Sequence, residues 1–323
     1  MHPHPSPDRP AGSPASTTAA AHRTAGSAPA WAVGSTPVHR VDEIDFPPET
    51  GAWLLPDATP DVVARAPWLT PDFADDEGVL RASSHSFAFT VDGRRVLVDT
   101  GIGNGKQRAM PAWHQLDTDY LDRLTAAGYP PDSVDLVILT HLHADHVGWN
   151  TRLENGTWVP TFPHARYVTT RTEWDHWASV DMEESRRQMF RDSVHPVREA
   201  GLLDVVDIAE GPVALAPGLR LLPTPGHTPG QVAVELRDSG DTALITGDAV
   251  HHPVQLAHPH LSSCADTDSA LARSTRAALL ASAAESRALL LGTHFAPPTA
   301  GRLTRDGTGF QLTPERPVLA QTY

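Results

Sequence analysis

The chain has 323 residues, enough for one large domain or two small ones, and its 39 acidic and 25 basic residues give a net charge of −14. A surface this acidic repels a phosphate backbone, which argues against nucleic acid as a substrate. Its single cysteine excludes an intramolecular disulfide. No apolar run reaches the ~18 residues that cross a bilayer, so we expect a cytoplasmic protein with no membrane partner.

Residues 1–33 are dominated by Pro, Ala, Ser, Thr, Gly and His, with one large aromatic side chain, Trp31. Such a segment cannot bury enough apolar surface to offset the entropy lost on ordering. We therefore predict a disordered N-terminal tail over residues 1–33 and a folded domain over residues 34–323.

The domain begins with short strand candidates separated by turn clusters. Strands are predicted at 38–41, 86–91 and 95–98, and Asp92-Gly93 between the last two is a strong hairpin signal. Residues 53–80, rich in proline and acids, are predicted to be mostly loop, attached to the body by Trp53, Trp68 and Phe73. The glycine-rich stretch 99–106 lacks the spacing of a phosphate-binding loop, so a nucleotide site is rejected.

A helix predicted over 116–127 leads into the apolar strand 134–139, and four potential metal ligands follow at once in His141-Leu142-His143-Ala144-Asp145-His146. In an extended segment His141 and His143 share a face, while a turn lets Asp145 and His146 reach a second position. A solvated histidine-rich loop is the alternative. The spacing at a strand end favours metal binding.

Three later turns each offer one more ligand beside a strand-like run: His227, Asp248 and His294. Between them we predict a hairpin over 149–163 and a helix over 172–194, which Pro196 ends and which contributes to the core or to a pocket wall. The remaining predictions are strands at 165–169, 203–208, 219–222, 232–236, 242–246 and 288–291, and a helix over 269–286.

The central motif, the later His, the Asp and the last His stand in the order seen in the metallo-β-lactamase superfamily, which this chain resembles over roughly residues 38–310. Val98-Asp99-Thr100-Gly101 adds a fifth matching motif. The resemblance implies an α/β fold, the αβ/βα four-layer sandwich, with a dinuclear metal site at the edge of the two sheets. It also implies two zinc ions per chain, although iron or manganese stays open.

Carried over by position, the resemblance implies one metal held by three histidines and a second held by a carboxylate and two histidines. The first set is His141, His143 and His227; the second is Asp145, His146 and His294; Asp248 bridges the two. A bridging water or hydroxide would then attack the substrate, so no protein nucleophile is needed. Asp99 is expected beneath the metals, where it would orient a ligand imidazole or cap a turn.

Within the superfamily the chain is most similar to the acyl-homoserine lactonase and methyl parathion hydrolase branch. The lactonases place a Tyr three residues after the bridging Asp, where this chain has His251. We expect an ester or lactone hydrolase with phosphotriesterase side activity, whose catalytic candidates are Asp145, Asp248 and His251. His251 or His252 would bond the leaving oxygen. A non-catalytic metal-binding module and a β-lactamase or thioesterase remain alternatives.

The expected partner is a small, neutral, apolar substrate, and a homodimer is left open. Its pocket wall is predicted to include Trp149, the helix from Trp174 to Phe190, and His251.

Overall fold

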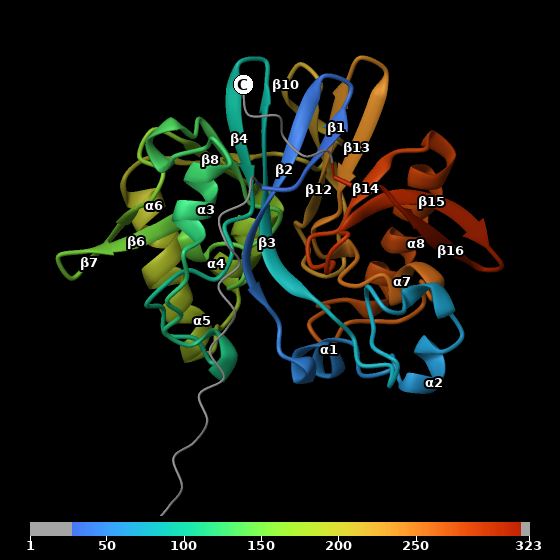
Figure 1. The fold of residues 1–323 in the computed structure, drawn as a ribbon. Coiled ribbons are helices and arrows are strands. Elements are labelled where there is room, and N and C mark those ends of the chain that lie inside the picture. The colour runs from blue at the N-terminus through green and yellow to red at the C-terminus, as the bar shows by residue number, and fades with distance from the viewer. Residues whose placement is uncertain (1–27, 318–323) are drawn as a thin grey trace, which may run out of the picture.

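Two seven-stranded β-sheets pack face to face in this computed structural model, which describes residues 28–317 (Figure 1). In spatial order the first sheet contains β1 (Ala30–Val33), β2 (Thr36–Asp45), β3 (Ser83–Val91), β4 (Arg94–Val98), β5 (Leu136–Ile138), β8 (Arg166–Thr170) and β9 (Leu203–Val206). The second contains β10 (Val213–Ala216), β11 (Leu219–Pro223), β12 (Val232–Asp238), β13 (Asp241–Ile245), β14 (Leu289–Leu291), β15 (Ala300–Asp306) and β16 (Gly309–Pro314).

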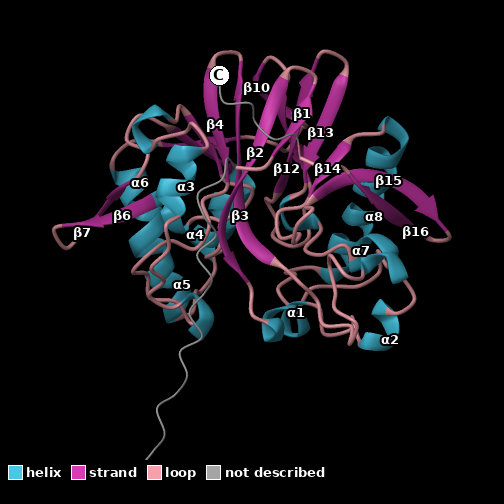
Figure 2. Cartoon of the chain, viewed as in Figure 1, coloured by secondary structure: helices cyan, strands magenta, loops and turns pink. Residues whose placement is uncertain are grey.

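Helices cover the outer face of each sheet (Figure 2). The first sheet is covered by α3 (Tyr120–Ala126), α4 (Arg171–Ser179), α5 (Glu184–Met189) and α6 (His195–Glu199). The second is covered by α1 (Pro48–Leu54), α2 (Pro60–Val63), α7 (Val254–Ala257) and α8 (Ser269–Ser286). A β-branched and aromatic core fills the space between the sheets, so the predicted αβ/βα sandwich is confirmed.

Parallel pairing brings the ends of the strands next to the candidate ligands to one edge of each sheet. β4, β5 and β8 pair in parallel in the first sheet, as do β13 and β14 in the second. Their carboxyl ends therefore lie on the same side of each sheet, and the loops that follow them meet between the two sheets. The small hairpin of β6 (Thr151–Glu154) and β7 (Thr157–Pro160) was predicted and extends away from this edge.

The predicted boundary of the N-terminal tail is wrong at its end. Residues 30–33 form β1, which pairs antiparallel with β2, and Trp31 is only 2% exposed in the core between the sheets. Composition missed this strand because four residues carry little periodicity, whereas one large aromatic ring buries enough surface to hold it. The rest of the predicted tail, residues 1–27, lies outside the described residues.

The helix predicted over 172–194 is divided. α4 ends at Ser179, α5 begins at Glu184, and a π-helical turn over Phe190–Val194 joins α5 to α6. Pro196 does not end the helix as predicted; it lies in the first turn of α6, where a missing N–H costs no hydrogen bond. The extra residue of the π turn allows α6 to start there.

Other differences are smaller. α3 begins at Tyr120 rather than at 116, and β10, β15 and β16 were not predicted. Phe73 is buried as expected, but Trp53 is 50% exposed and does not attach residues 53–80 to the body. Helix α8 has the predicted bounds: Asp268 accepts hydrogen bonds from the amides of Ala270 and Leu271, and Arg287 adopts left-handed φ at its end.

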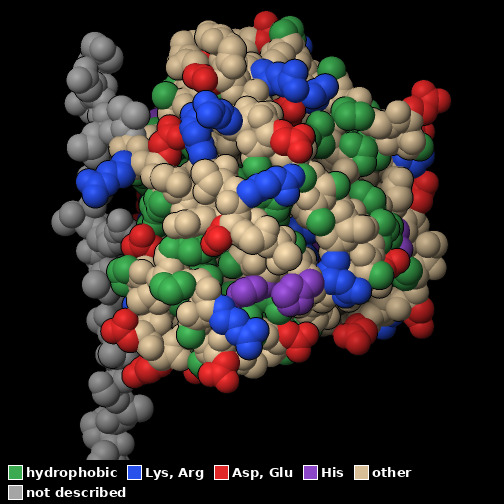
Figure 3. Space-filling view, turned by 90° about the vertical axis from the view of Figure 1, so that its right-hand side faces the viewer, with side chains coloured by type: hydrophobic (Ala, Val, Ile, Leu, Met, Phe, Trp, Pro, Cys, Tyr) green, Lys and Arg blue, Asp and Glu red, His purple; other side chains and the backbone are tan. Residues whose placement is uncertain are grey.

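No helix within residues 28–317 is long and apolar enough to cross a membrane. On the face that carries α8 and the β15–β16 hairpin, acidic and basic side chains are interspersed (Figure 3).

Candidate metal centre

Four loops meet at the carboxyl edge of the sheets and carry all seven predicted ligands. They are the segment after β5, the turn between β11 and β12, the short 3-10 turn Gly247–Ala249 after β13, and the turn after β14. Gly226 and Gly230 flank His227 where the backbone lies against α8 and α4: a Cβ would stand 2.3 Å from the amide nitrogen of Ala272 and 2.0 Å from that of Glu173, respectively. Only glycine fits at these two contacts.

The first group of ligands is formed by His141, His143 and His227, whose candidate ligand atoms all lie within 4.8 Å of one another. His227 Nε2 is 2.9 Å from His143 Nδ1. The second group is formed by Asp145, His146 and His294. Here His294 Nε2 is 3.3 Å from His146 Nε2 and 3.6 Å from Asp145 Oδ2.

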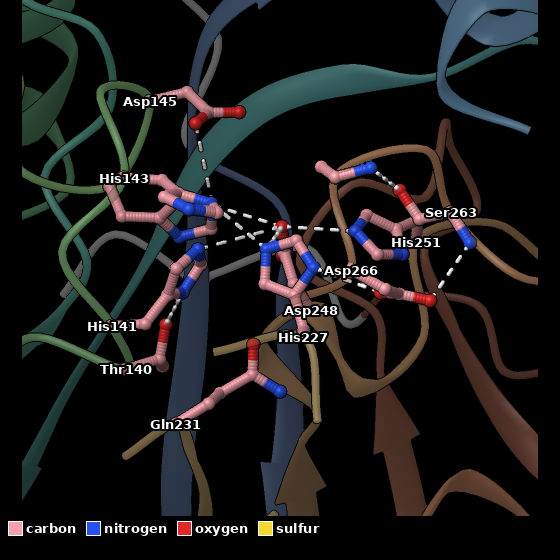
Figure 4. Close-up of polar contacts among 12 residues, drawn as sticks. Thr140, His141, His143, Asp145, His227, Gln231, Asp248, His251, Ser263 and Asp266 are labelled. Carbon is pink, nitrogen blue, oxygen red and sulfur yellow. Dashed lines mark hydrogen bonds and ion pairs between the residues drawn. The ribbon is translucent and has the colours of Figure 1, made fainter. Parts of the chain in front are cut away.

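Asp248 lies between the two groups (Figure 4). Its Oδ2 is 3.4 Å from His227 Nε2 and 3.8 Å from His141 Nε2. The same oxygen is 3.4 Å from His146 Nε2, and Oδ1 is 3.2 Å from His294 Nε2. One carboxylate therefore faces ligands of both groups, which is the position that the resemblance assigns to a bridging ligand.

The donor set fits divalent cations. Imidazole nitrogens of neighbouring rings face one another, and His141 Nε2 and Asp248 Oδ1 are buried with no hydrogen-bond partner among the described residues. Buried polar atoms without partners are rare because they lose the bonds that water would supply. A zinc ion in each group would give these lone pairs a partner, and imidazole with carboxylate is a zinc-type donor set.

Protonation states favour ligation in the first group. Burial, reinforced by the neighbouring histidines, holds the pKa of His141 and of His143 well below the usual value, so both rings are neutral. Although burial opposes it, the neighbouring imidazoles of His146, His294 and His251 hold the pKa of Asp248 well below its usual range. The first group thus presents two neutral rings beside an ionised carboxylate, whereas in the second group the Asp248 carboxylate, against the effect of burial, raises the pKa of His146 and of His294.

Outer hydrogen bonds fix which nitrogen faces the centre in both rings of the second group. Asp99 Oδ2 lies 2.9 Å from His146 Nδ1, and the carboxylate also accepts the amide of Thr140 at 2.8 Å. His294 Nδ1 donates to the carbonyl oxygen of Ser83 at 3.0 Å. Each Nδ1 therefore carries a proton, leaving Nε2 free to ligate. Asp99 takes the orienting position that the sequence suggested.

Two positioning carboxylates were missed. Asp266 Oδ1 lies 3.1 Å from His227 Nδ1 (Figure 4), and Glu173 accepts hydrogen bonds from the amides of Leu142 and Gly230 at 2.9 and 3.1 Å. Glu173 thereby joins both ligand turns of the first group to α4. Neither residue carries a sequence signal: each is an ordinary acid near a helix start, and only tertiary packing brings it to the centre.

His251 and His252 have different surroundings. His251 Nε2 is 3.3 Å from Asp248 Oδ2, and neither ring nitrogen has a hydrogen-bond partner among the described residues. His252 points away: its Nε2 donates to the carbonyl oxygen of Phe73 at 2.8 Å, and its Nδ1 accepts the amide of Val254 at 3.0 Å. Of the two candidates for bonding a leaving oxygen, only His251 faces the centre.

A cavity of about 530 Å³ opens above the ligands. Trp149 was predicted to line it, which is wrong: its ring stacks on Tyr120, and its Nε1 donates to Glu43 Oε1 at 2.8 Å. The segment 174–190 contributes through four residues, and His251 lines the cavity as predicted. Other walls come from residues that the sequence did not single out for the pocket. The non-ligand lining is Phe46, Thr50, Trp53, Leu54, Arg108, Ala109, Met110, Pro111, Trp113, Ala144, Glu183, Ser185, Arg186, Met189, His251 and Ala265.

Comparison with known proteins identifies the family. Residues 79–294 match the family model of the metallo-beta-lactamase superfamily. An N-acyl homoserine lactonase of Bacillus thuringiensis is 31% identical over 128 residues, 39% of this chain and 42% of that protein. A second, from Rhizobium radiobacter, is 28% identical over 142 residues, 43% of this chain and 51% of that protein. The matches thus span only about half of these relatives.

Solved structures agree over a larger share of the chain. AidC, a dizinc quorum-quenching lactonase with a bound product, superimposes with a TM-score of 0.73 over 90% of this chain and 97% of its own, at 20% identity. The hydrolase AbOPH has a TM-score of 0.72 over 93% of this chain and 100% of its own, at 21% identity. At these identities the likeness shows the fold. Together with the family match over more than half of its length, it establishes that this chain belongs to the metallo-β-lactamase superfamily.

Proposed function

We propose that this protein is a metal-dependent hydrolase of ester or lactone bonds, with phosphotriesterase side activity. The observation that carries the proposal is Asp248, which faces both ligand groups at the floor of the cavity. A single structural ion would not require a carboxylate in this shared position or an open space above it. The N-acyl homoserine lactonases among the relatives support the choice of bond.

The candidate ligands form two metal positions that share one carboxylate. His141, His143 and His227 would hold one ion, and Asp145, His146 and His294 the other, with Asp248 common to both. Two divalent ions, most simply zinc, would supply Lewis-acid polarisation of the scissile oxygen and would make water acidic enough to act as a nucleophile near neutral pH. Asp99, Asp266 and the Ser83 carbonyl keep the ligating nitrogens aimed inward.

His251 is the candidate for stabilising the leaving oxygen. Burial lowers the pKa of His251, so its ring is neutral near pH 7 and offers one N–H donor. The ring lines the cavity beside Asp248 and lies nearly parallel to that of His294, at an interplanar angle of 9°. A donor held there can hydrogen-bond an oxygen that gains negative charge as the acyl bond breaks.

The cavity suits a small substrate with an apolar body. Its volume is in the range of small-molecule sites, and most of the non-ligand lining is apolar. An acyl chain would bury apolar surface against Phe46, Met110 and Trp113, which supports an acyl ester or lactone over a polyanionic substrate.

The test is a substrate panel on the zinc-loaded protein: aryl esters, lactones of increasing chain length, thioesters, β-lactams and dialkyl aryl phosphates. We expect turnover of esters or lactones, loss of it on chelation, recovery with zinc, and about two metals per chain by elemental analysis. His251→Ala should lower kcat, while the exposed His164→Ala serves as the control. Turnover of β-lactams alone, or activity that survives complete metal removal, would contradict the proposal.

A further inference from the structure

The guanidinium of Arg186 lines one side of the cavity and is held in place by the aromatic ring on which it stacks. Arg186, on α5, lies over the ring of Trp177, with Cζ 4.1 Å from the ring centroid. Trp177 is itself fixed, because its Nε1 donates to Glu173 Oε1 at 2.7 Å, and its ring lies 5.7 Å from that of the ligand His143. Stacking limits the freedom of the guanidinium plane before any ligand arrives.

The donors of this guanidinium are unused. Within the described part of the chain, the Arg186 side chain makes no hydrogen bond or ion pair. The carboxylates of Glu173, Glu183 and Asp145 act on it electrostatically, but none bonds to it. A half-buried arginine has five N–H donors, and those that face a cavity lack hydrogen-bond acceptors unless a ligand or water supplies them.

Arg108 provides the contrast, because it lines the same cavity with both of its terminal Nη atoms already bonded to the protein. Its Nη1 and Nη2 donate to the two oxygens of Asp192 at 2.9 and 3.1 Å, and Nη2 also reaches Ser193 Oγ at 3.0 Å. Its charge is neutralised within the wall. Of the two arginines that line this cavity, only Arg186 has a charge without a bonded carboxylate and Nη donors without a partner.

The opposite wall is apolar. Phe46 directly follows β2, Trp53 and Leu54 come from helix α1, and Met110 and Trp113 come from the segment after β4. Trp53 is 50% exposed there, unusual for so large a ring and typical of a surface that covers a ligand. The cavity thus has an apolar side and a side with one unsatisfied cation, with the metal ligands at the floor.

We propose that Arg186 is a specificity-determining residue that binds a planar oxygen acceptor of the substrate, a carboxylate or an amide carbonyl, outside the scissile group. This inference rests on the proposed ester or lactone hydrolysis, and it narrows the substrate to an acyl compound with an apolar body and one such acceptor. Glu183 at the mouth is exposed, so solvent screens its charge. The stacked, half-buried guanidinium is screened less by solvent than an exposed arginine, so its attraction for a substrate oxygen is stronger.

The experiment compares three γ-lactones that differ only in the α-substituent: an alkyl chain, an acylamino chain of equal length, and an alkyl chain ending in a carboxylate. Arg186→Gln should lower kcat/KM for the acylamino and carboxylate lactones by about 10- to 100-fold, mainly through KM, and change the alkyl lactone less than about twofold. Arg187→Gln is the matched control, because Arg187 follows on the same helix but pairs with Glu184 at 3.0 Å and does not line the cavity.

A binding measurement separates failure of this inference from failure of the proposed function. γ-Lactams with the same three substituents are titrated calorimetrically into wild type and both variants, with and without zinc. We expect Arg186→Gln to weaken the acylamino and carboxylate lactams selectively, whether or not the lactones are turned over. An equal loss for all three substituents, or no loss, overturns the role of Arg186. Selective binding without hydrolysis of any lactone overturns the proposed function alone.

Discussion

Asp99 Oδ2 lies 2.9 Å from Nδ1 of His146, the ligand ring whose Nε2 faces both Asp248 and His294. Asp99 is 2% exposed, adopts a positive φ of 57° and accepts both the amide and the hydroxyl of Thr140. The residue that aims His146 is therefore held by the first residue of the ligand loop. Orientation of the ring and shape of the loop depend on the same carboxylate.

Asp99→Asn should weaken zinc binding by about 10- to 100-fold, because an amide can present its NH₂ group to Nδ1 and no longer fixes the ring. Competition with a chromophoric chelator measures the zinc affinity directly. The exposed Asp132→Asn is the control of equal charge change. Unchanged zinc affinity in Asp99→Asn would mean that Asp99 only shapes the turn.

Asp248→Asn tests the shared ligand. The substitution keeps the shape but removes the charge that faces both groups, so we expect kcat to fall by about three orders of magnitude and the metal content to drop below two per chain. Circular dichroism should be unchanged. Near-normal turnover with two metals bound would show that Asp248 is a turn residue.

How far the sequence predicts the site depends on the kind of contact. Each of the four segments that carry the candidate ligands lies next to an apolar strand, so motif order and strand position were enough to bring His141 and His294 to one centre. Asp266 and Glu173 were invisible because their roles arise where α8 and α4 pack against the ligand turns. Contacts between segments far apart in the sequence leave no pattern in the residues next to them.

The cavity wall was predicted less well for the same reason. Trp149 is next to the ligand loop in sequence, yet its ring packs against Tyr120 in the core of the first sheet. Phe46 and Trp113 are distant in sequence and line the cavity. Hydrophobicity indicates that an aromatic ring is buried, but the choice between core and cavity is made by the path of loops that no periodicity describes.

We predict that the N-terminus can be shortened without loss of stability only if Trp31 is kept. Deleting residues 1–33 removes β1 and a buried ring whose Nε1 donates to the carbonyl oxygen of Glu315 at 2.7 Å. We expect a loss of about 3 to 5 kcal/mol in the free energy of unfolding, as for a buried Trp→Ala change. Deleting residues 1–27 should leave it unchanged, as composition predicts. Urea denaturation of the two truncated proteins and of Trp31→Ala makes the comparison.

His252 should make the metal-free fold sensitive to acid. Burial lowers the pKa of His252 to about 4, below the usual 6.5, and protonation of Nδ1 would break the bond from the Val254 amide. Because the folded-state pKa is depressed, the unfolded chain takes up the proton first. The contribution of His252 is complete above pH 6.5 and is lost as pH falls toward 4.

Linkage gives a loss of about 2 kcal/mol from this group between pH 7.5 and pH 5. Chelator-treated wild type and His252→Gln are unfolded in urea at both values, and the variant should lose less stability on acidification by about that amount. The exposed His164→Gln should behave as wild type. If all three proteins lose the same unfolding free energy on acidification, groups other than His252 cause the acid sensitivity.

We predict that substitution of Asp192 changes both the stability of the fold and the binding of substrate in the cavity. It lies in the π-helical turn, 1% exposed, with Arg108 bonded to both oxygens and Lys106 Nζ 3.8 Å away. These two cations begin the loop that carries Met110 and Trp113 to the cavity wall. Asp192→Asn leaves both buried without a counter-charge, and we expect a loss of about 3 to 5 kcal/mol in the free energy of unfolding, with a raised KM.

The pair can be separated by a double-mutant cycle. Burial lowers the pKa of Lys106 to about 7, and the negative charge of Asp192 opposes that shift, so Asp192→Asn should make Lys106 more costly to keep charged. Lys106→Met in the Asp192→Asn background removes one uncompensated cation and should recover part of the lost stability. In wild type the same change should recover none, because it removes a partner of Asp192. Additive effects in urea unfolding would show that Lys106 and Asp192 act independently, leaving Arg108 as the only cation that Asp192 stabilises.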